Sequence, residues 1–298
     1  MKRNLYTAVL VACALPLLVA CSSLIFEDYS DCPISSGRLL FEYEADGEAN
    51  VLPQYIHNAV LFIYDLEGTL VYEAELSDKE LNSPQGLTLP TLPPGSYRVI
   101  VWGNADHSSF ENRDQLSSAT LTAANSAAEN DPLYFASEVI KGEGEPIQHM
   151  VHFSSAHIKI EIVCRYFSAL YGEGFTPVIE ISSTACHYLF DQSGIPLPTD
   201  EVRDYQIPVN YSASDDSHTA RFAALRFTSD DTSIMVRMRH PETDEVLAEV
   251  DLKEYIKNLT PPLEERQEAT ISIELVCSAL GVTITPPVWE GGEITPNV

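Results

Sequence analysis

Hydrophobic and polar residues alternate along much of this 298-residue chain, most clearly in its second half. From Ile158 to Cys164 every second residue is apolar, and the same alternation returns over Ser233–Arg239 and Thr270–Cys277. A period of two with one apolar face predicts β-strands in antiparallel sheets that pack on a hydrophobic core.

The first half carries the same signal with one informative exception. Arg38–Glu44 and Ser96–Trp102 predict strands, whereas Ala59–Tyr64 is almost continuously apolar and predicts a strand that is covered on both faces. The turn residues Asp65–Gly68 and the run Leu70–Glu75 then complete a predicted β-hairpin.

Two stretches depart from the strand pattern. Residues 105–132 are polar and weakly periodic, which predicts a long loop with at most one short helix. Over Asp251–Leu259 the apolar residues fall at i, i+3, i+4 and i+7, the spacing of a short amphipathic helix. Pro261 and Pro262 are expected to end it.

These elements predict an all-β protein with two β-sandwich domains in tandem. We expect the sandwiches to span residues 38–145 and 146–285, because the segment Lys141–Pro146 is charged and rich in glycine and proline, as interdomain connections tend to be. Residues 286–298 carry three prolines and two glycines and predict an extended tail.

Residues 1–20 have the pattern of a secretory signal peptide. Lys2 and Arg3 precede an apolar run that is shorter than the roughly 20 residues needed to span a bilayer. The run ends in Leu-Val-Ala before Cys21, a pattern that a lipoprotein signal peptidase reads. We therefore predict lipidation of Cys21 with palmitate-type chains, a lipidated linker over residues 21–37, and an outer-membrane, surface-exposed location. An ordinary signal peptide with a chance cysteine is the alternative.

The charge balance narrows the range of partners. The formal net charge is −27 at pH 7, and loss of Lys2 and Arg3 with the signal makes the remaining chain more acidic. Such a surface repels phosphate backbones and anionic leaflets, so we expect no nucleic-acid partner and membrane attachment through the lipid alone.

Four cysteines remain after the signal peptide and the lipidated residue are set aside: Cys32, Cys164, Cys186 and Cys277. In an exported chain they allow two disulfides in three connectivities. Cys164 and Cys277 both close alternating apolar runs, so buried free thiols are the other possibility.

The sequence contains no GxSxG elbow, phosphate-binding loop or HExxH helix. Cys186 and His187 are adjacent in a predicted strand, where their side chains would face opposite sides. His149 and His152 lack a third metal ligand nearby. We therefore expect a non-enzymatic protein without cofactor or metal.

Several segments resemble the fimbrium-anchoring subunit family, the FimB-like outer-membrane lipoproteins. The resemblance is carried by Cys32-Pro33 shortly after the lipidated cysteine, by Asn58–Asp65, by Leu92–Asn104 and by Asp251–Ile256. It implies two transthyretin-like sandwiches in a protein at the base of a fimbrium. It also implies anchoring of the fimbrium to the outer membrane, termination of its growth, and partners that are fimbrial stalk subunits joined by β-strand exchange.

The C-terminal segment is the candidate partner-binding region. Val282 and Ile284 alternate with threonines, and Val288 and Trp289 add apolar surface after Pro286-Pro287. This segment is either donated to a neighbouring subunit or completes the sheet of its own domain.

Two other functions share the anchor and the sandwiches. A surface glycan-binding lipoprotein would need clustered exposed aromatic residues, and the chain has only two tryptophans. A stalk or tip fimbrillin would lose its lipidated segment by proteolysis, for which Arg38 is a candidate cleavage site.

Overall fold

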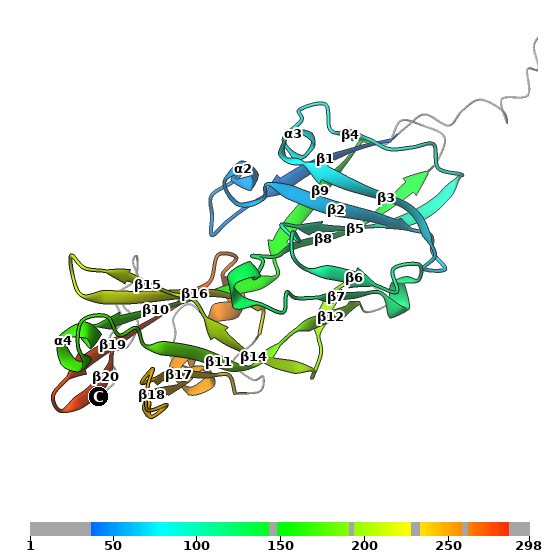
Figure 1. Ribbon diagram of the computed structural model, residues 1–298. Coiled ribbons are helices and arrows are strands. Elements are labelled where there is room, and N and C mark those ends of the chain that lie inside the picture. Colours follow the sequence, from blue (N-terminus) through cyan, green and yellow to red (C-terminus); the bar gives the residue numbers. More distant parts are fainter. Residues whose placement is uncertain (1–36, 143–147, 191–193, 228–232, 258–261, 286–298) are drawn as a thin grey trace, which may run out of the picture.

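The structure, a computed structural model, describes residues 37–142, 148–190, 194–227, 233–257 and 262–285 (Figure 1). It consists mostly of β-strands, which confirms the all-β prediction. In Figure 1 the strands of the first half form the upper body, most strands of the second half form the lower body, and a small sheet lies between them. No helix within the described ranges is long and apolar enough to cross a membrane.

The first body is a seven-stranded sheet that folds over on itself, in the order β3-β2-β5-β8-β9-β1-β4. Its strands are β1 (Arg38–Tyr43), β2 (Asn58–Tyr64), β3 (Leu70–Ser77), β4 (Leu87–Thr88), β5 (Gly95–Gly103), β8 (Tyr134–Gly142) and β9 (Gln148–Ser155). β8 and β9 pair only through Tyr134 with Ser155 and Phe135 with Ser154. One hydrophobic core therefore collects side chains from β2, β5 and β8 as well as from β1 and β9. The helices α2 (Leu52–Tyr55) and α3 (Asp78–Leu81) border this core.

A second core covers the other face of β2 and β5. Phe62, Ile100 and Trp102 pack there against Leu121 and Tyr188. β2 is thus buried on both sides, which confirms the prediction from Ala59–Tyr64.

The covering layer is a four-stranded sheet in the order β13-β12-β7-β6. Its strands are β6 (Ser109–Glu111), β7 (Thr120–Thr122), β12 (His187–Phe190) and β13 (Pro196–Pro198), with the 3₁₀ turns η2 (Leu116–Ser118) and η3 (Ala127–Glu129) beside them. The prediction of a long loop over residues 105–132 missed two short strands, although most of the segment is irregular. Its short strands β6 and β7 form because β12, some 65 residues later, pairs with β7.

The second body packs a five-stranded sheet, β15-β16-β10-β19-β20, on a four-stranded sheet, β14-β11-β17-β18. Its strands are β10 (His157–Arg165), β11 (Val178–Ala185), β14 (Val202–Ile207), β15 (Val209–Ser212), β16 (Ser217–Leu225), β17 (Met235–Arg239), β18 (Val246–Asp251), β19 (Thr270–Ser278) and β20 (Gly281–Thr285). Its short helices are α4 (Phe167–Tyr171), α5 (Leu252–Ile256) and η4 (Leu263–Glu265). The alternating isoleucines of β10, β11 and β19 point into the core between the two sheets.

Strand direction differs from the prediction in two places. β1 pairs with β9 in parallel, and β10 pairs with β19 in parallel, so both large sheets are mixed rather than antiparallel. Alternation with a period of two indicates which face of a strand is buried. It is the same in parallel and antiparallel pairing, so it does not predict strand direction.

The boundary predicted after residue 145 separates β8 from β9, which pair with each other. β9 also pairs with β1 over six residues and therefore belongs to the first sandwich. The division of the chain into two domains stays a prediction. The pairing of β9 with β1 places the boundary between the domains at the end of β9, at Ser155.

The helix predicted over Asp251–Leu259 is present as α5, Leu252–Ile256. The side chain of Asp251 caps it by accepting a hydrogen bond from the Lys253 amide, and Leu252 and Ile256 are buried. The remainder of the predicted helix includes residues outside the described ranges.

The three cysteines within the described ranges, Cys164, Cys186 and Cys277, are buried free thiols. The Sγ atoms of Cys164 and Cys277 lie 3.6 Å apart in the second core. These two residues thus behave as small core residues, whereas Cys32 lies outside the described residues.

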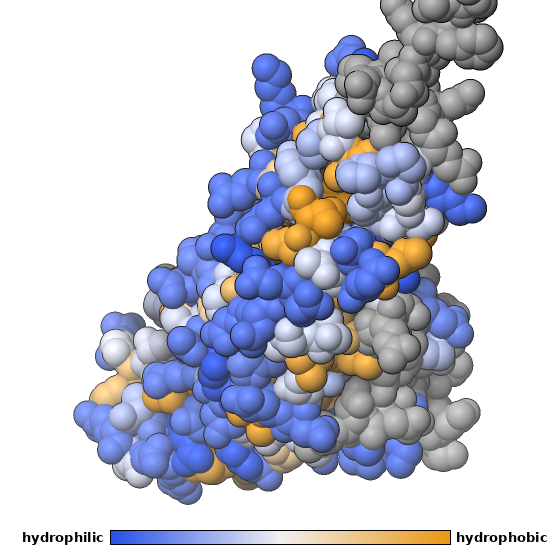
Figure 2. Space-filling view, turned by 90° about the vertical axis from the view of Figure 1, so that its right-hand side faces the viewer, coloured by the Kyte–Doolittle hydropathy of each residue, from blue (hydrophilic) through white to orange (hydrophobic). Residues whose placement is uncertain are grey.

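The face shown in Figure 2 is predominantly hydrophilic, with hydrophobic atoms gathered mainly in one band across its upper half. This distribution agrees with the acidic composition.

Candidate functional site

The predicted partner-binding segment begins as an edge strand. β20 pairs antiparallel with β19, and Val282 and Ile284 lie opposite Cys277 and Leu275. Val282 packs against the second core, Ile284 is 37% exposed, and Leu280 at the tip of the β19–β20 hairpin is fully exposed. Within the single chain, residues 281–285 therefore complete the sheet of their own sandwich.

Three of the predicted site residues lie outside the described residues. They are the lipidation site Cys21 and the partner-binding residues Val288 and Trp289. Their assignments remain predictions from the sequence.

A largely buried carboxylate joins the two sandwiches. Glu268 Oε1 accepts hydrogen bonds from the hydroxyls of Tyr43 (2.7 Å) and Tyr134 (2.8 Å), and Glu268 Oε2 accepts one from Lys159 Nζ (2.7 Å). The tyrosines belong to β1 and β8 of the first sandwich, whereas Lys159 lies on β10 of the second.

The electrostatics of this joint hold the carboxylate in its charged form. Burial by itself raises the pKa of Glu268, but hydrogen bonds from Lys159 and Tyr43 and the charge of Lys159 outweigh it, so the pKa of Glu268 lies below its ordinary value. Burial and the bond to Glu268 raise the pKa of Tyr43, so its hydroxyl stays a donor. In the sequence, Glu268 is one of 44 acidic residues and no pattern distinguishes it.

His157 lies beside this carboxylate joint and is almost completely buried. Its Nδ1 atom lies 2.9 Å from the carbonyl oxygen of Leu133 and therefore donates its proton there. Burial, the largest cause, lowers the pKa of His157 from 6.5 to about 4.

We expect this histidine to make the protein less stable as the pH falls. The unfolded imidazole takes up a proton near pH 6.5, whereas the folded one stays neutral until about pH 4. The contribution of His157 to the free energy of unfolding should therefore decline across that interval, by about 3 kcal/mol in total, and then level off. The measurement is urea unfolding of the chain and of His157→Gln, which keeps a donor but does not titrate. His152→Gln on the exposed side of β9 is the control, and an equal decline in all three proteins would contradict the assignment.

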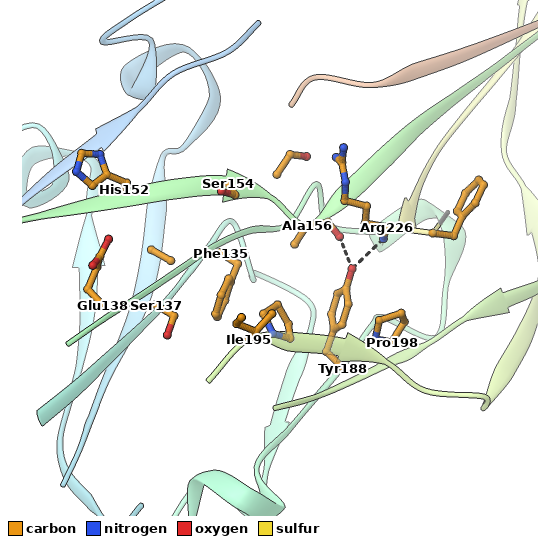
Figure 3. A pocket seen from close by; sticks show the side chains of 14 residues that line it. Phe135, Ser137, Glu138, His152, Ser154, Ala156, Tyr188, Ile195, Pro198 and Arg226 are labelled. Carbon is orange, nitrogen blue, oxygen red and sulfur yellow. Dashed lines mark hydrogen bonds between the residues drawn. The ribbon is translucent and has the colours of Figure 1, made fainter. Parts of the chain in front are cut away.

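A pocket of about 730 Å³ opens between the first sandwich and the small sheet (Figure 3). Phe135, Tyr188 and Ile195 provide apolar lining, and Glu138, His152 and Arg226 provide polar groups. The hydroxyl of Tyr188 donates to the Ala156 carbonyl oxygen (2.7 Å) and accepts from the Arg226 amide (2.8 Å), as the dashed lines of Figure 3 show. These bonds fix the floor of the pocket.

The pocket contains one serine in contact with a histidine, but the pair is not arranged for catalysis. Ser155 Oγ lies 3.2 Å from His157 Nδ1, the nitrogen that donates to Leu133. The serine itself donates to the His157 carbonyl oxygen (3.0 Å). A nitrogen that already carries a proton cannot take one from the serine, so this arrangement does not activate a nucleophile.

Two comparisons of the sequence with known proteins indicate the same group. A family model described as fimbrillin-A associated anchor proteins Mfa1 and Mfa2 matches residues 29–291. The minor fimbrium anchoring subunit Mfa2 of Porphyromonas gingivalis is 24% identical over 89 residues, which are 30% of this chain and 28% of that relative.

Solved structures show the same fold over greater lengths. The fimbrial anchor protein Mfa2 from Porphyromonas gingivalis aligns over 84% of this chain and 97% of its own, with a TM-score of 0.60 and 16% identity. A Bacteroides ovatus protein described as an adhesin candidate aligns over 86% of this chain and 94% of its own, with a TM-score of 0.68 and 14% identity. At these identities the likeness concerns the fold.

Proposed function

Because the chain belongs to the family of fimbrillin-A associated anchor proteins, we propose that it is a non-enzymatic surface lipoprotein that anchors a fimbrium to the outer membrane and ends its growth. The family match over residues 29–291 is the observation that carries this proposal. The shared fold with a fimbrial anchor protein supports it.

Attachment to the membrane is assigned to the lipid on Cys21. The supporting observations are the cysteine at the end of the signal-like apolar run and the acidity of the chain, which disfavours contact with an anionic leaflet. Acyl chains contribute about 0.8 kcal/mol per buried CH₂, and two or more chains hold a protein stably.

Attachment to the fimbrium is assigned to strand exchange at the C-terminal segment, with contacts from Val282, Ile284, Val288 and Trp289. β20 ends the five-stranded sheet, so a partner strand that pairs with this segment would extend a ladder already in place. Main-chain hydrogen bonds would supply affinity, and alternate side chains would supply specificity.

We expect Ile284→Asp to detach fimbriae without unfolding the protein. The side chain lies at a partly exposed position of β20, where a carboxylate can reach water in the single chain but would be buried by a partner strand. Fimbriae that co-purify with outer membranes should fall by at least about tenfold, the equivalent of 1.4 kcal/mol.

Val246→Asp is the matched control for Ile284→Asp. Val246 is exposed to a similar extent and lies on β18, the edge strand of the facing sheet. Equal losses of fimbriae in both variants, or a normal level in Ile284→Asp, would remove β20 from the partner interface.

The glycan-binding alternative finds little support at Trp102 or in the pocket. Trp102 is fully buried, and the aromatic residues that line the pocket, Phe135, Tyr188 and Phe227, are each at most 8% exposed. Stacking on a sugar ring requires an accessible aromatic face.

The stalk or tip alternative requires proteolysis, and its candidate cleavage site, Arg38, is held within the first sheet. Its backbone position pairs with Thr88 on one side and Gln148 on the other. The strand would have to unfold locally before a protease could bind it and cleave the peptide bond after Arg38.

Location within the polymer tests the proposed function directly. Immunogold labelling of sheared and cell-bound fimbriae should place this chain only at the cell-proximal end. Labelling along the shaft or at the distal tip would favour the stalk or tip alternative.

A further inference from the structure

The chain passes between two sheets twice at one place between the sandwiches. It leaves the four-stranded sheet of the second body from β11 to β12 and returns to it from β13 to β14. β11 ends at Ala185 in the four-stranded sheet of the second body, and β12 begins at His187 in the small sheet. Cys186 lies between them, where its amide donates to the Glu201 carbonyl oxygen (3.1 Å) and its carbonyl oxygen accepts from the Ala123 amide (2.8 Å). The crossover thus brings Glu201 next to Cys186 and His187.

Three metal-ligating side chains converge at this crossover. The ligand atoms of Cys186, His187 and Glu201 all lie within 4.8 Å of one another. The prediction that Cys186 and His187 face opposite sides was wrong, because the two residues do not belong to one continuous strand.

The geometry leaves one buried nitrogen unsatisfied. His187 Nε2 lies 3.2 Å from Glu201 Oε1, but the pair lacks hydrogen-bond geometry, and this nitrogen has no hydrogen-bond partner among the described residues. His187 Nδ1 lies 2.7 Å from Thr122 Oγ1. A proton on Nδ1, shared with the threonine, would leave the lone pair of Nε2 directed at the cluster.

We propose that Cys186 Sγ, His187 Nε2 and Glu201 Oε1 form a binding site for a zinc ion, with water in the fourth position. A thiolate, an imidazole and a carboxylate are the ligand types that zinc accepts together. Tetrahedral bonds of about 2.0–2.3 Å place ligand atoms roughly 3.3–3.6 Å apart, so the three side chains need only small movements.

The surrounding residues suit a bound cation in two ways. The bond from His187 to Thr122 is the kind of contact that orients metal-bound histidines. The side chain of Glu201 is 72% exposed and can close over an ion that enters from solvent. Thiolate and carboxylate together balance the charge of Zn²⁺, and the Cys186 proton passes to the buffer on binding.

The bound ion would connect the small sheet to the second sandwich. Cys186 and His187 are held to β7 of the first half, and Glu201 directly precedes β14 of the second sandwich. The ion would therefore cross-link the layer that covers Trp102 to the second sandwich.

Cobalt titration of the full-length lipidated chain in detergent, after treatment with a chelator, tests the site. We expect one equivalent of Co²⁺ to give a thiolate-to-cobalt charge-transfer band, which Zn²⁺ then abolishes. Cys186→Ser should remove the band. Thr122→Val should weaken binding by about 10–100-fold, and Glu201→Gln by at least as much.

Glu138→Gln is the matched control, because Glu138 faces His149 at 3.6 Å without a nearby thiol ligand. It should leave the band and the affinity unchanged. A band that persists in Cys186→Ser, an affinity unchanged in Glu201→Gln, or no saturable band in the parent chain would each overturn the proposal. Since Glu201 is exposed, its variant decides the question even if Cys186→Ser fails to fold.

Discussion

Replacing Trp102 with alanine is expected to lower the free energy of unfolding by about 3–5 kcal/mol. Trp102 is 0% exposed, and its ring centroid lies 4.9 Å from that of Phe135, 5.5 Å from that of Tyr188 and 5.9 Å from that of Phe190. Phe135 belongs to the first sandwich, whereas Tyr188 and Phe190 belong to β12. The truncation would open a cavity where the small sheet meets the first sandwich. Urea unfolding followed by circular dichroism measures the loss.

Trp102→Phe is the control for this prediction. The indole Nε1 has no hydrogen-bond partner among the described residues, so phenylalanine removes ring volume without breaking a hydrogen bond. Its cost should be clearly smaller than that of alanine. A cost below about 1 kcal/mol for Trp102→Ala would show that the contact between the sheets contributes little.

Replacing Cys21 with alanine is expected to move the protein from the outer-membrane fraction to the soluble fraction almost completely. The prediction rests on the sequence Leu18-Val19-Ala20-Cys21 after a basic start and an apolar run. Without acyl chains, the remaining chain is acidic and is repelled by an anionic leaflet. Fractionation and mass spectrometry of the mature N-terminus provide the measurement.

Cys32→Ala is the matched control, because this cysteine follows the predicted lipidation site by only 11 residues. Its location should not change. Retention of Cys21→Ala in the membrane fraction would mean that another part of the protein holds it there, and the lipid assignment would then be abandoned.

The sequence was sufficient to locate most strands and their buried faces. The isoleucines of β10 and the continuous apolar run of β2 predicted one-sided and two-sided burial, and both predictions are confirmed. The buried face of a strand can be predicted from a short stretch of sequence, because apolar residues recur at every second position on that face.

Pairing between distant segments could not be predicted in the same way. β6 and β7 are three residues each, too short to show a period, and they depend on β12 for a partner. Glu268 joins the two sandwiches only because the fold places Tyr43 and Tyr134 of the first sandwich within hydrogen-bond distance. The cluster of Cys186, His187 and Glu201 forms because the chain passes between two sheets there. The spacing of these residues in the sequence does not predict that crossover.

The parallel pairing of β1 with β9 has a mechanical consequence for a protein that tethers a filament. Tension from the membrane would enter at the start of β1, and tension from the second sandwich would enter at the end of β9, where the chain continues into β10. The two forces pull the neighbouring strands past each other, so the six residue pairs between Arg38 and Tyr43 share the load instead of opening one by one. Single-molecule pulling from the two chain ends would register this arrangement as a high rupture force, whereas a low force would assign the load to another element.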